Sequence, residues 1–97
     1  MTTYLFANRA PKDYRGSADG LEAWNKWFDE LGSHLEERGN PAFRRESVGA
    51  ATTATDLVGY TLVEAKDLDE AVGLAKTCPL VGWGGGIEVG ELTIINQ

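Results

Sequence analysis

The sequence contains few side chains that could carry out acid–base or ligand chemistry. It has one histidine, His34, and Trp27 precedes it by seven residues. Seven residues are about two helical turns, so on a helix both side chains would lie along one edge of the apolar stripe. A polar ring beside an indole would suit an organic ligand with one polar group. If the chain has a ligand-binding pocket, we predict that its wall includes His34 and Trp27, followed by Arg9 and Tyr60.

Each of these four residues also has a purely structural interpretation. His34 could be hydrogen-bonded at the surface, Trp27 could be packing, Arg9 could be solvated, and Tyr60 could lie in the core or in a dimer interface. A histidine that acts as a general base needs a partner that orients it, and the sequence identifies none. We therefore assign no catalytic residue.

Cys78 is the only cysteine, so no internal disulfide is possible, which is typical of a reducing compartment. It ends a predicted helix, where the negative end of the helix dipole disfavours a thiolate, and its expected role is packing. One histidine and one cysteine form no recognisable set of metal ligands. We expect neither a metal site nor a cofactor.

Four glycines surround Trp83 in the segment 82–86. A dinucleotide-binding loop follows a strand and precedes a helix, because the helix N-terminus binds the phosphates. Here the glycines follow a predicted helix and precede a predicted strand, and Ile87 stands where that motif has its last glycine. The segment is therefore predicted to be a tight turn whose glycines need positive φ angles or close backbone approach, with Trp83 packed over it.

The net charge of −6 makes nucleic acid an unexpected partner. Basic residues form two sets, Arg9, Lys12 and Arg15 in the first and Arg44 and Arg45 in the second. The predicted topology places these sets at opposite ends of the sheet, so they should not form one anion site within a single chain. Solvated surface is the favoured interpretation of both.

The chain has 97 residues, enough for one domain covering residues 1–97. No segment has the length of a membrane span, and the first residues lack the basic and apolar regions of a secretion signal. We expect no membrane partner and a cytoplasmic location.

Apolar periodicity predicts the order of the elements. A strand is expected at 3–8, and a helix at 17–38 is indicated by Leu21, Trp24, Phe28, Leu31 and Leu35, with Ser17 or Asp19 as its cap. Trp24 would face the core and Trp27 the edge of the stripe. A weaker strand follows at 42–49 and a strong one at 57–65.

Asp67 and Glu70 form a capping box that opens a helix reaching Cys78, closed by Pro79, and a last strand is expected at 87–95. The order βαββαβ predicts an α+β ferredoxin-like fold with a four-stranded antiparallel sheet. Two helices can cover one sheet face only, yet alternate residues of the last two strands are apolar on both faces. We therefore predict a homodimer packed sheet to sheet.

The chain from the third predicted strand onward resembles the YciI-like (YCII-related, or DGPF-domain) family. The resemblance rests on Gly59-Tyr60, Glu64-Ala65, residues 67–71, Cys78-Pro79 and residues 87–89, and earlier on Trp24, Trp27-Phe28 and Leu31-Gly32. It implies a dimeric α+β barrel with a cleft between sheet and helices. The Asp-Gly-Pro-Phe motif is missing, and neither His34 nor Cys78 matches the position of the family's proposed His–Asp pair, so no catalytic residue carries over.

Three functions remain open at this point. The favoured one is binding of a small organic molecule in a cleft between the first helix and the sheet. The second is a cofactor-free enzyme, isomerase-like or oxygenase-like, acting on a small aromatic or polyketide-like substrate, by analogy of fold. The third is a structural or interaction domain whose partner is itself.

Overall fold

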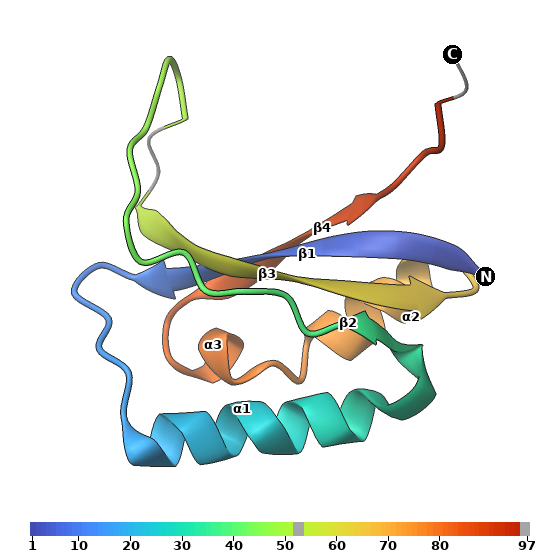
Figure 1. The fold of residues 1–97 in the computed structure, drawn as a ribbon, viewed down its shortest axis with the longest axis horizontal. Coiled ribbons are helices and arrows are strands. Elements are labelled where there is room, and N and C mark those ends of the chain that lie inside the picture. Colours follow the sequence, from blue (N-terminus) through green and yellow to red (C-terminus); the bar gives the residue numbers. More distant parts are fainter. Residues whose placement is uncertain (52–53, 96–97) are drawn as a thin grey trace.

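The computed structural model describes residues 1–51 and 54–95. In chain order its elements are β1 (Thr2–Pro11), α1 (Ala18–Leu31), the short 3₁₀ helix η1 (Gly32–His34), β2 (Leu35–Glu37), β3 (Thr55–Ala65), α2 (Leu68–Ala75), α3 (Pro79–Gly82) and β4 (Gly86–Glu91). The strands form one antiparallel sheet in the order β2-β3-β1-β4. All helices lie on one face of this sheet (Figure 1). The predicted α+β ferredoxin-like fold is confirmed.

The core lies between the sheet and the helices. Strand β1 alternates strictly, with Tyr4, Phe6, Asn8 and Ala10 buried on the helix side. Val63 of β3 and Trp27 of α1 are buried against them, and the rings of Phe6 and Trp27 stack with centroids 6.2 Å apart. Because side chains of β1 alternate between the two faces of the sheet, only every second one can reach the region next to α1.

The first helix is shorter than predicted. It starts as expected, with Ser17 accepting a hydrogen bond from the Gly20 amide. It ends at Leu31, because Gly32 adopts a positive φ of 55° and turns the chain away. Leu35, which extended the apolar spacing of the helix, instead lies in β2 and pairs with Val63. The boundary at residue 38 was wrong.

The predicted strand at 42–49 was also wrong. The second strand is β2, and after it the chain is joined to β3 by a bridge between Pro41 and Gly59 and by a hydrogen bond from the Ala42 amide to the Val58 carbonyl. We call residues 38–42 the strap. A Cβ atom on Gly39 would lie 1.7 Å from the Tyr60 carbonyl oxygen, so only glycine permits this close crossing.

The glycine segment at 82–86 is the predicted connection. Gly84 has a φ of 90°, and a Cβ atom on Gly85 would lie 2.2 Å from the Arg9 carbonyl oxygen. Both expected needs, positive φ and close backbone approach, are present. Three details differ from the prediction. Helix α2 ends at Ala75 rather than at Cys78, Pro79 begins the one-turn helix α3, and β4 ends at Glu91 rather than at residue 95.

A bulge in the pairing of β1 and β3 sets the two faces of the sheet. The register shifts between Asn8 and Arg9, so Leu57 pairs with Arg9 and joins Tyr60 and Leu62 on the side away from the helices. We call this side the outer face. From β1 and β3 it presents Leu5, Ala7, Arg9, Leu57, Tyr60, Leu62 and Glu64.

The outer face is less apolar than the sequence suggested. Ile87 and Val89 of β4 pair with the helix-facing Asn8 and Phe6, which leaves Gly86, Glu88 and Gly90 on the outer face. The segment around residues 43–50 and the chain end at 92–95 both project on this uncovered side (Figure 1).

Candidate ligand-binding cleft

A cleft of about 840 Å³ opens beside α1. Its lining comes from β1, the loop before α1, α1 itself, the strap with the residues after it, and the start of β3: Asn8, Asp13, Tyr14, Arg15, Gly16, Ser17, Leu21, Trp24, Asn25, Phe28, Arg38, Gly39, Asn40, Pro41, Ala42, Phe43, Arg45, Asp56, Val58, Gly59 and Tyr60. The volume is in the range of sites for small organic molecules. The cleft lies between the first helix and the sheet, where the sequence predicted one.

One wall of the cleft is aromatic. Trp24 and Phe28 of α1 both line it, and their rings stack with centroids 5.7 Å apart. Trp27 does not line it, because it is 2% exposed and its indole N–H points to the carbonyl of Leu74 and the hydroxyl of Thr77. The two tryptophans thus have the reverse of the expected roles: Trp27 is core, and Trp24 borders the cleft.

The buried polar group of the cleft is Asn8, which is 5% exposed. Its Nδ2 lies 3.2 Å from the Thr61 hydroxyl, and that hydroxyl donates to the Arg38 carbonyl oxygen at 3.0 Å. Because a hydroxyl has one proton to give, Thr61 can only accept from Asn8, and this fixes the orientation of the amide. Asn8 Oδ1 is left without a hydrogen-bond partner among the described residues.

Arg38 places its positively charged guanidinium at the same wall. Its guanidinium carbon lies 4.3 Å from the centroid of the Phe28 ring, and its Nη2 donates to Asn25 Oδ1 at 2.6 Å. Stacking on an aromatic ring and a hydrogen bond to an amide oxygen limit the rotamers of the guanidinium while most of its N–H groups stay available. The strap therefore contributes a positioned arginine to the cleft.

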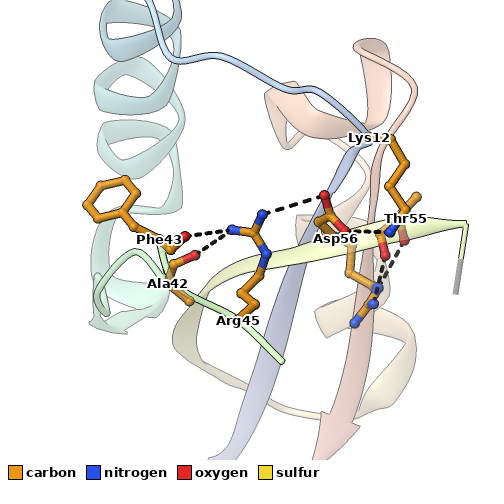
Figure 2. A network of polar contacts seen from close by, with 7 residues as sticks. Lys12, Ala42, Phe43, Arg45, Thr55 and Asp56 are labelled. Carbon is orange, nitrogen blue, oxygen red and sulfur yellow. Dashed lines mark hydrogen bonds and ion pairs between the residues drawn. The ribbon is translucent and has the colours of Figure 1, made fainter. Parts of the chain in front are cut away.

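A charge network lies at the start of β3, where Asp56 accepts from Lys12 at 2.6 Å and pairs with Arg45 at 3.5 Å (Figure 2). Arg45 also donates to the carbonyl oxygens of Ala42 and Phe43. The hydrogen bond from Lys12, helped by the nearby charges of Lys12, Arg45 and Arg9, holds the pKa of Asp56 below its ordinary value against partial desolvation. Asp56 is thus a carboxylate that links Lys12, just after β1, to Arg45, three residues after the strap.

This network corrects the expectation that the two basic sets lie at opposite ends of the sheet. Lys12 belongs to the first set and Arg45 to the second, yet both contact Asp56. Arg15 and Arg45 also line the same cleft. The reason is the position of the second strand: since β2 ends at Glu37 and the chain then follows β3 through the Pro41–Gly59 bridge, residue 45 lies beside the start of β3.

Of the four predicted pocket residues, the structure brings Tyr60 to the lining of the cleft. The Tyr60 hydroxyl donates to Glu37 Oε2 at 2.6 Å and accepts from Asn40 Nδ2 at 3.2 Å, so it is held between β2 and the strap. Its role in binding stays a prediction, as does that of the other three.

The other predicted residues lie elsewhere. Arg9 is on the outer face, and its guanidinium donates to the hydroxyl and carbonyl oxygens of Thr55. His34 is the last residue of η1, with Nδ1 2.8 Å from the Glu64 carbonyl oxygen and 4.0 Å from a Glu70 carboxylate oxygen. The line joining Trp27 to His34 along one helix edge does not exist, because the helix ends between them.

Asn8, Arg38 and Trp24 were not singled out from the sequence as pocket residues. A signal for Asn8 was present, since it occupies a position of β1 that alternation assigns to the core together with Tyr4 and Phe6. A polar side chain at such a position needs a partner. The position of Arg38 could not be recognised while residue 38 was placed at the end of a helix.

Cys78 has the packing role that was expected. It is buried between α2 and α3, and burial raises the pKa of its thiol to about 11. Among residues 1–51 and 54–95, no cluster of three or more His, Cys, Asp or Glu side chains could hold a metal ion. In the same part of the chain, no helix is both long enough and apolar enough to span a membrane.

No protein-family model matches the chain, and no curated protein sequence matches it significantly. A solved structure is similar, that of 5-chloro-2-hydroxyhydroquinone dehydrochlorinase (TftG) from Burkholderia phenoliruptrix AC1100 in complex with 2,5-dihydroxybenzoquinone. The TM-score is 0.63 at 17% sequence identity, and the match covers 96% of this chain and 94% of that chain. At this identity the likeness establishes the fold alone, and any chemical function has to be argued from the residues of the cleft. The chain shares the α+β fold of that enzyme over nearly its whole length.

Proposed function

We propose that the protein binds a small organic molecule in the cleft between α1 and the sheet. The observation that carries the proposal is Asn8, a residue of the cleft lining whose Oδ1 is a buried acceptor without a partner among the described residues. An unsatisfied buried polar group costs about 1–3 kcal/mol, so a fold that retains one has a reason to do so. A ligand that displaces the atoms now covering Oδ1 and donates a hydrogen bond to it would recover this free energy only when bound.

The shape and chemistry of the cleft support the proposal. Trp24 and Phe28 offer aromatic surface, and a few polar groups, including Asn8 and Arg38, converge on it. Ligand sites usually combine a mainly apolar lining with a small number of positioned polar groups. A domain that interacts only with itself would need neither the cleft nor the buried acceptor.

A cofactor-free enzyme is the second candidate. The short contact from the Tyr60 hydroxyl to Glu37 favours it, because a tyrosine beside a carboxylate is an arrangement that can move a proton. Tyr60 is a residue of the cleft lining, but its side chain and Glu37 meet at the outer face of β3. The similar fold of a dehydrochlorinase solved with 2,5-dihydroxybenzoquinone is consistent with small-molecule chemistry. Replacement of Tyr60 by Phe should then abolish turnover of a bound molecule while leaving its affinity within a few-fold.

We also propose that the protein is a divergent member of the YciI-like family and forms a homodimer through the outer face. Leu5, Leu57 and Leu62 lie on that face, and no helix of residues 1–51 and 54–95 covers it (Figure 1). The exposed side chains of Val48, Ile94 and Ile95 belong to the two segments that project on the same side. A second copy packed there would bury both sets. The cytoplasmic location remains a prediction.

Ligand binding is tested by titrating a panel of neutral and charged aromatic fragments into ¹⁵N-labelled protein and recording amide and arginine Nε resonances. We expect at least one fragment to shift the signals of Asn8, Thr61 and Arg38 in a saturable way. Gly73, which is exposed on α2 and is not among the cleft-lining residues, is the internal control. A folded protein whose cleft signals no fragment moves would contradict the proposal.

A further inference from the structure

We infer that the ligand of the cleft is an aromatic acid that also carries a hydroxyl group. The inference rests on the proposed function and specifies the chemical class of the molecule. It combines two properties of the lining, an excess of positive charge and a stacked aromatic wall, with one of the lining residue Asn8, whose buried Oδ1 has no partner among the described residues.

The charge of the cleft is opposite to that of the chain. Arg15, Arg38 and Arg45 line it, against the two carboxylates of Asp13 and Asp56, on a chain whose net charge is −6. Asp56 is further compensated by Lys12. An acidic protein that gathers arginines around a partly enclosed cleft attracts an anion there rather than a cation.

Arg38 is the arginine prepared to receive that anion. The Phe28 ring and Asn25 Oδ1 already hold its guanidinium, so little side-chain entropy remains to be lost on binding. Only Nη2 has a hydrogen bond among the described residues, which leaves the other N–H groups for a ligand. A guanidinium with free parallel N–H groups recognises a carboxylate in bidentate fashion.

The aromatic wall favours a planar molecule. Trp24 and Phe28 lie stacked with an interplanar angle of 28°, and Phe28 carries the arginine on its ring. A planar ring can extend this stack, whereas a saturated ring of the same size can use only its apolar area. An aromatic carboxylate would place its ring against this wall and its charge near Arg38.

Asn8 determines which second substituent the ring of the ligand carries. Because its amide orientation is fixed by Thr61, the group that meets Oδ1 must be a donor. A second carboxylate would bring two acceptors together and leave both unsatisfied in a buried place. A phenolic hydroxyl donates one hydrogen bond and carries no charge at neutral pH, so it fits.

The test is calorimetric titration of the unmodified chain with the isomeric hydroxybenzoates, and with benzoate, phenol and 4-hydroxycyclohexanecarboxylate as probes that each lack one feature. We expect the best hydroxybenzoate to bind about tenfold more tightly than benzoate, since one hydrogen bond to a buried acceptor is at stake. We expect phenol to bind about 10–100-fold more weakly, since the charge-assisted pair with Arg38 is lost.

Two variants assign these differences to the named groups. Asn8→Leu keeps the branching of the side chain and removes both Oδ1 and Nδ2, so it should abolish the preference for hydroxybenzoate over benzoate. Arg38→Gln should weaken binding of both carboxylates and leave phenol unaffected. Arg44→Gln, which removes the same charge from a residue outside the lining, is the control.

The outcomes separate this inference from the proposed function. If neutral fragments shift the cleft signals but phenol binds as tightly as the hydroxybenzoates and Arg38→Gln changes nothing, the ligand class is wrong and the cleft remains a binding site. If hydroxybenzoates bind but Asn8→Leu leaves their preference intact, the role of Oδ1 is overturned. If neither the fragment panel nor the acids bind to folded protein, both proposals fail.

Discussion

The hydroxyl of Thr61 donates to the main-chain carbonyl of Arg38, and this bond is one of those that join β3 to the strap. It also uses the only proton of Thr61, which forces Asn8 to present its NH₂ group to Thr61 and its oxygen elsewhere. The unpartnered acceptor in the cleft is therefore a consequence of how the strap is attached.

Thr61→Val should destabilise the protein, because it leaves both Asn8 Nδ2 and the Arg38 carbonyl without this partner. We expect a loss of about 1–3 kcal/mol in the free energy of unfolding, measured by urea denaturation. Thr3→Val, the same change at a site that contacts Glu36 at the surface, is the control and should cost much less. Equal losses for both variants would show that the buried network contributes nothing specific.

Gly39→Ala should be among the most destabilising alanine substitutions in the chain. Its positive φ of 81° and the contact of a Cβ atom with the Tyr60 carbonyl would push the strap away from β3. The expected cost is at least about 2 kcal/mol. Gly73→Ala, at a helical position with open space around it, should instead stabilise the protein by about 0.5–1 kcal/mol. Thermal unfolding of the two variants decides the matter; a neutral Gly39→Ala would contradict the close crossing.

The sequence identified the elements better than it identified the site. Strands β1 and β3 and the two long helices show clear periodicity, and Pro79 and the glycines of 82–86 mark the connection to β4. The end of α1 was missed because Leu35 fits a helical stripe as well as it fits a strand. That error displaced the second strand and hid the strap, and with it Arg38 and the meeting of Lys12 and Arg45 at Asp56.

The bulge at Asn8 was equally invisible, because an extra residue in one strand depends on its pairing and leaves no local pattern. It reverses the face on which Leu57 lies relative to strict alternation. The orientation of the Asn8 amide depends on Thr61, 53 residues away, and on Arg38. Because such contacts depend on tertiary structure, the sequence could show only that residue 8 is polar, not how its amide is oriented.

Cys78 should react slowly with thiol reagents in the folded protein. Burial raises the pKa of its thiol to about 11, so the reactive thiolate is scarce at neutral pH and the sulfur is inaccessible. Its folded pKa lies above the ordinary value of 9.0, so its contribution to stability is complete below about pH 9 and decreases as the pH rises towards 11. Labelling rates with and without urea test the first point. Cys78→Ala should flatten the alkaline fall in stability; an unchanged fall would assign it to other groups.

Asp56 should contribute to stability at neutral pH and lose that contribution in acid. Its pKa is lowered in the folded state, so the contribution is present above the ordinary value of 3.8 and is lost as the pH falls through the folded pKa. Lys12→Met removes the main cause and should raise the pKa of Asp56, as measured by carboxyl carbon shifts in NMR. Lys26→Met, on the exposed side of α1, should leave it unchanged. If both variants behave alike, the contact with Lys12 does not determine the titration of Asp56.

The structure assigns neighbouring residues of β3 to opposite faces of the sheet, so the predicted homodimer can be tested with one variant on each face. Val63 is fully buried beneath the helices, so Val63→Asp should unfold the chain, at a cost of about 3–5 kcal/mol or more for an unpaired buried charge. Leu62, the residue before Val63 in β3, pairs with Leu5 on the outer face and is only partly covered within one chain. Leu62→Asp should therefore keep the far-ultraviolet spectrum of the folded protein and split the dimer.

Leu68→Asp, at the exposed start of α2, is the control and should remain dimeric. Light scattering should give about twice 10.5 kDa for the unmodified chain and for the control, and about 10.5 kDa for Leu62→Asp. An unmodified chain that stays at 10.5 kDa at high micromolar concentration would show that the outer face functions without a second copy.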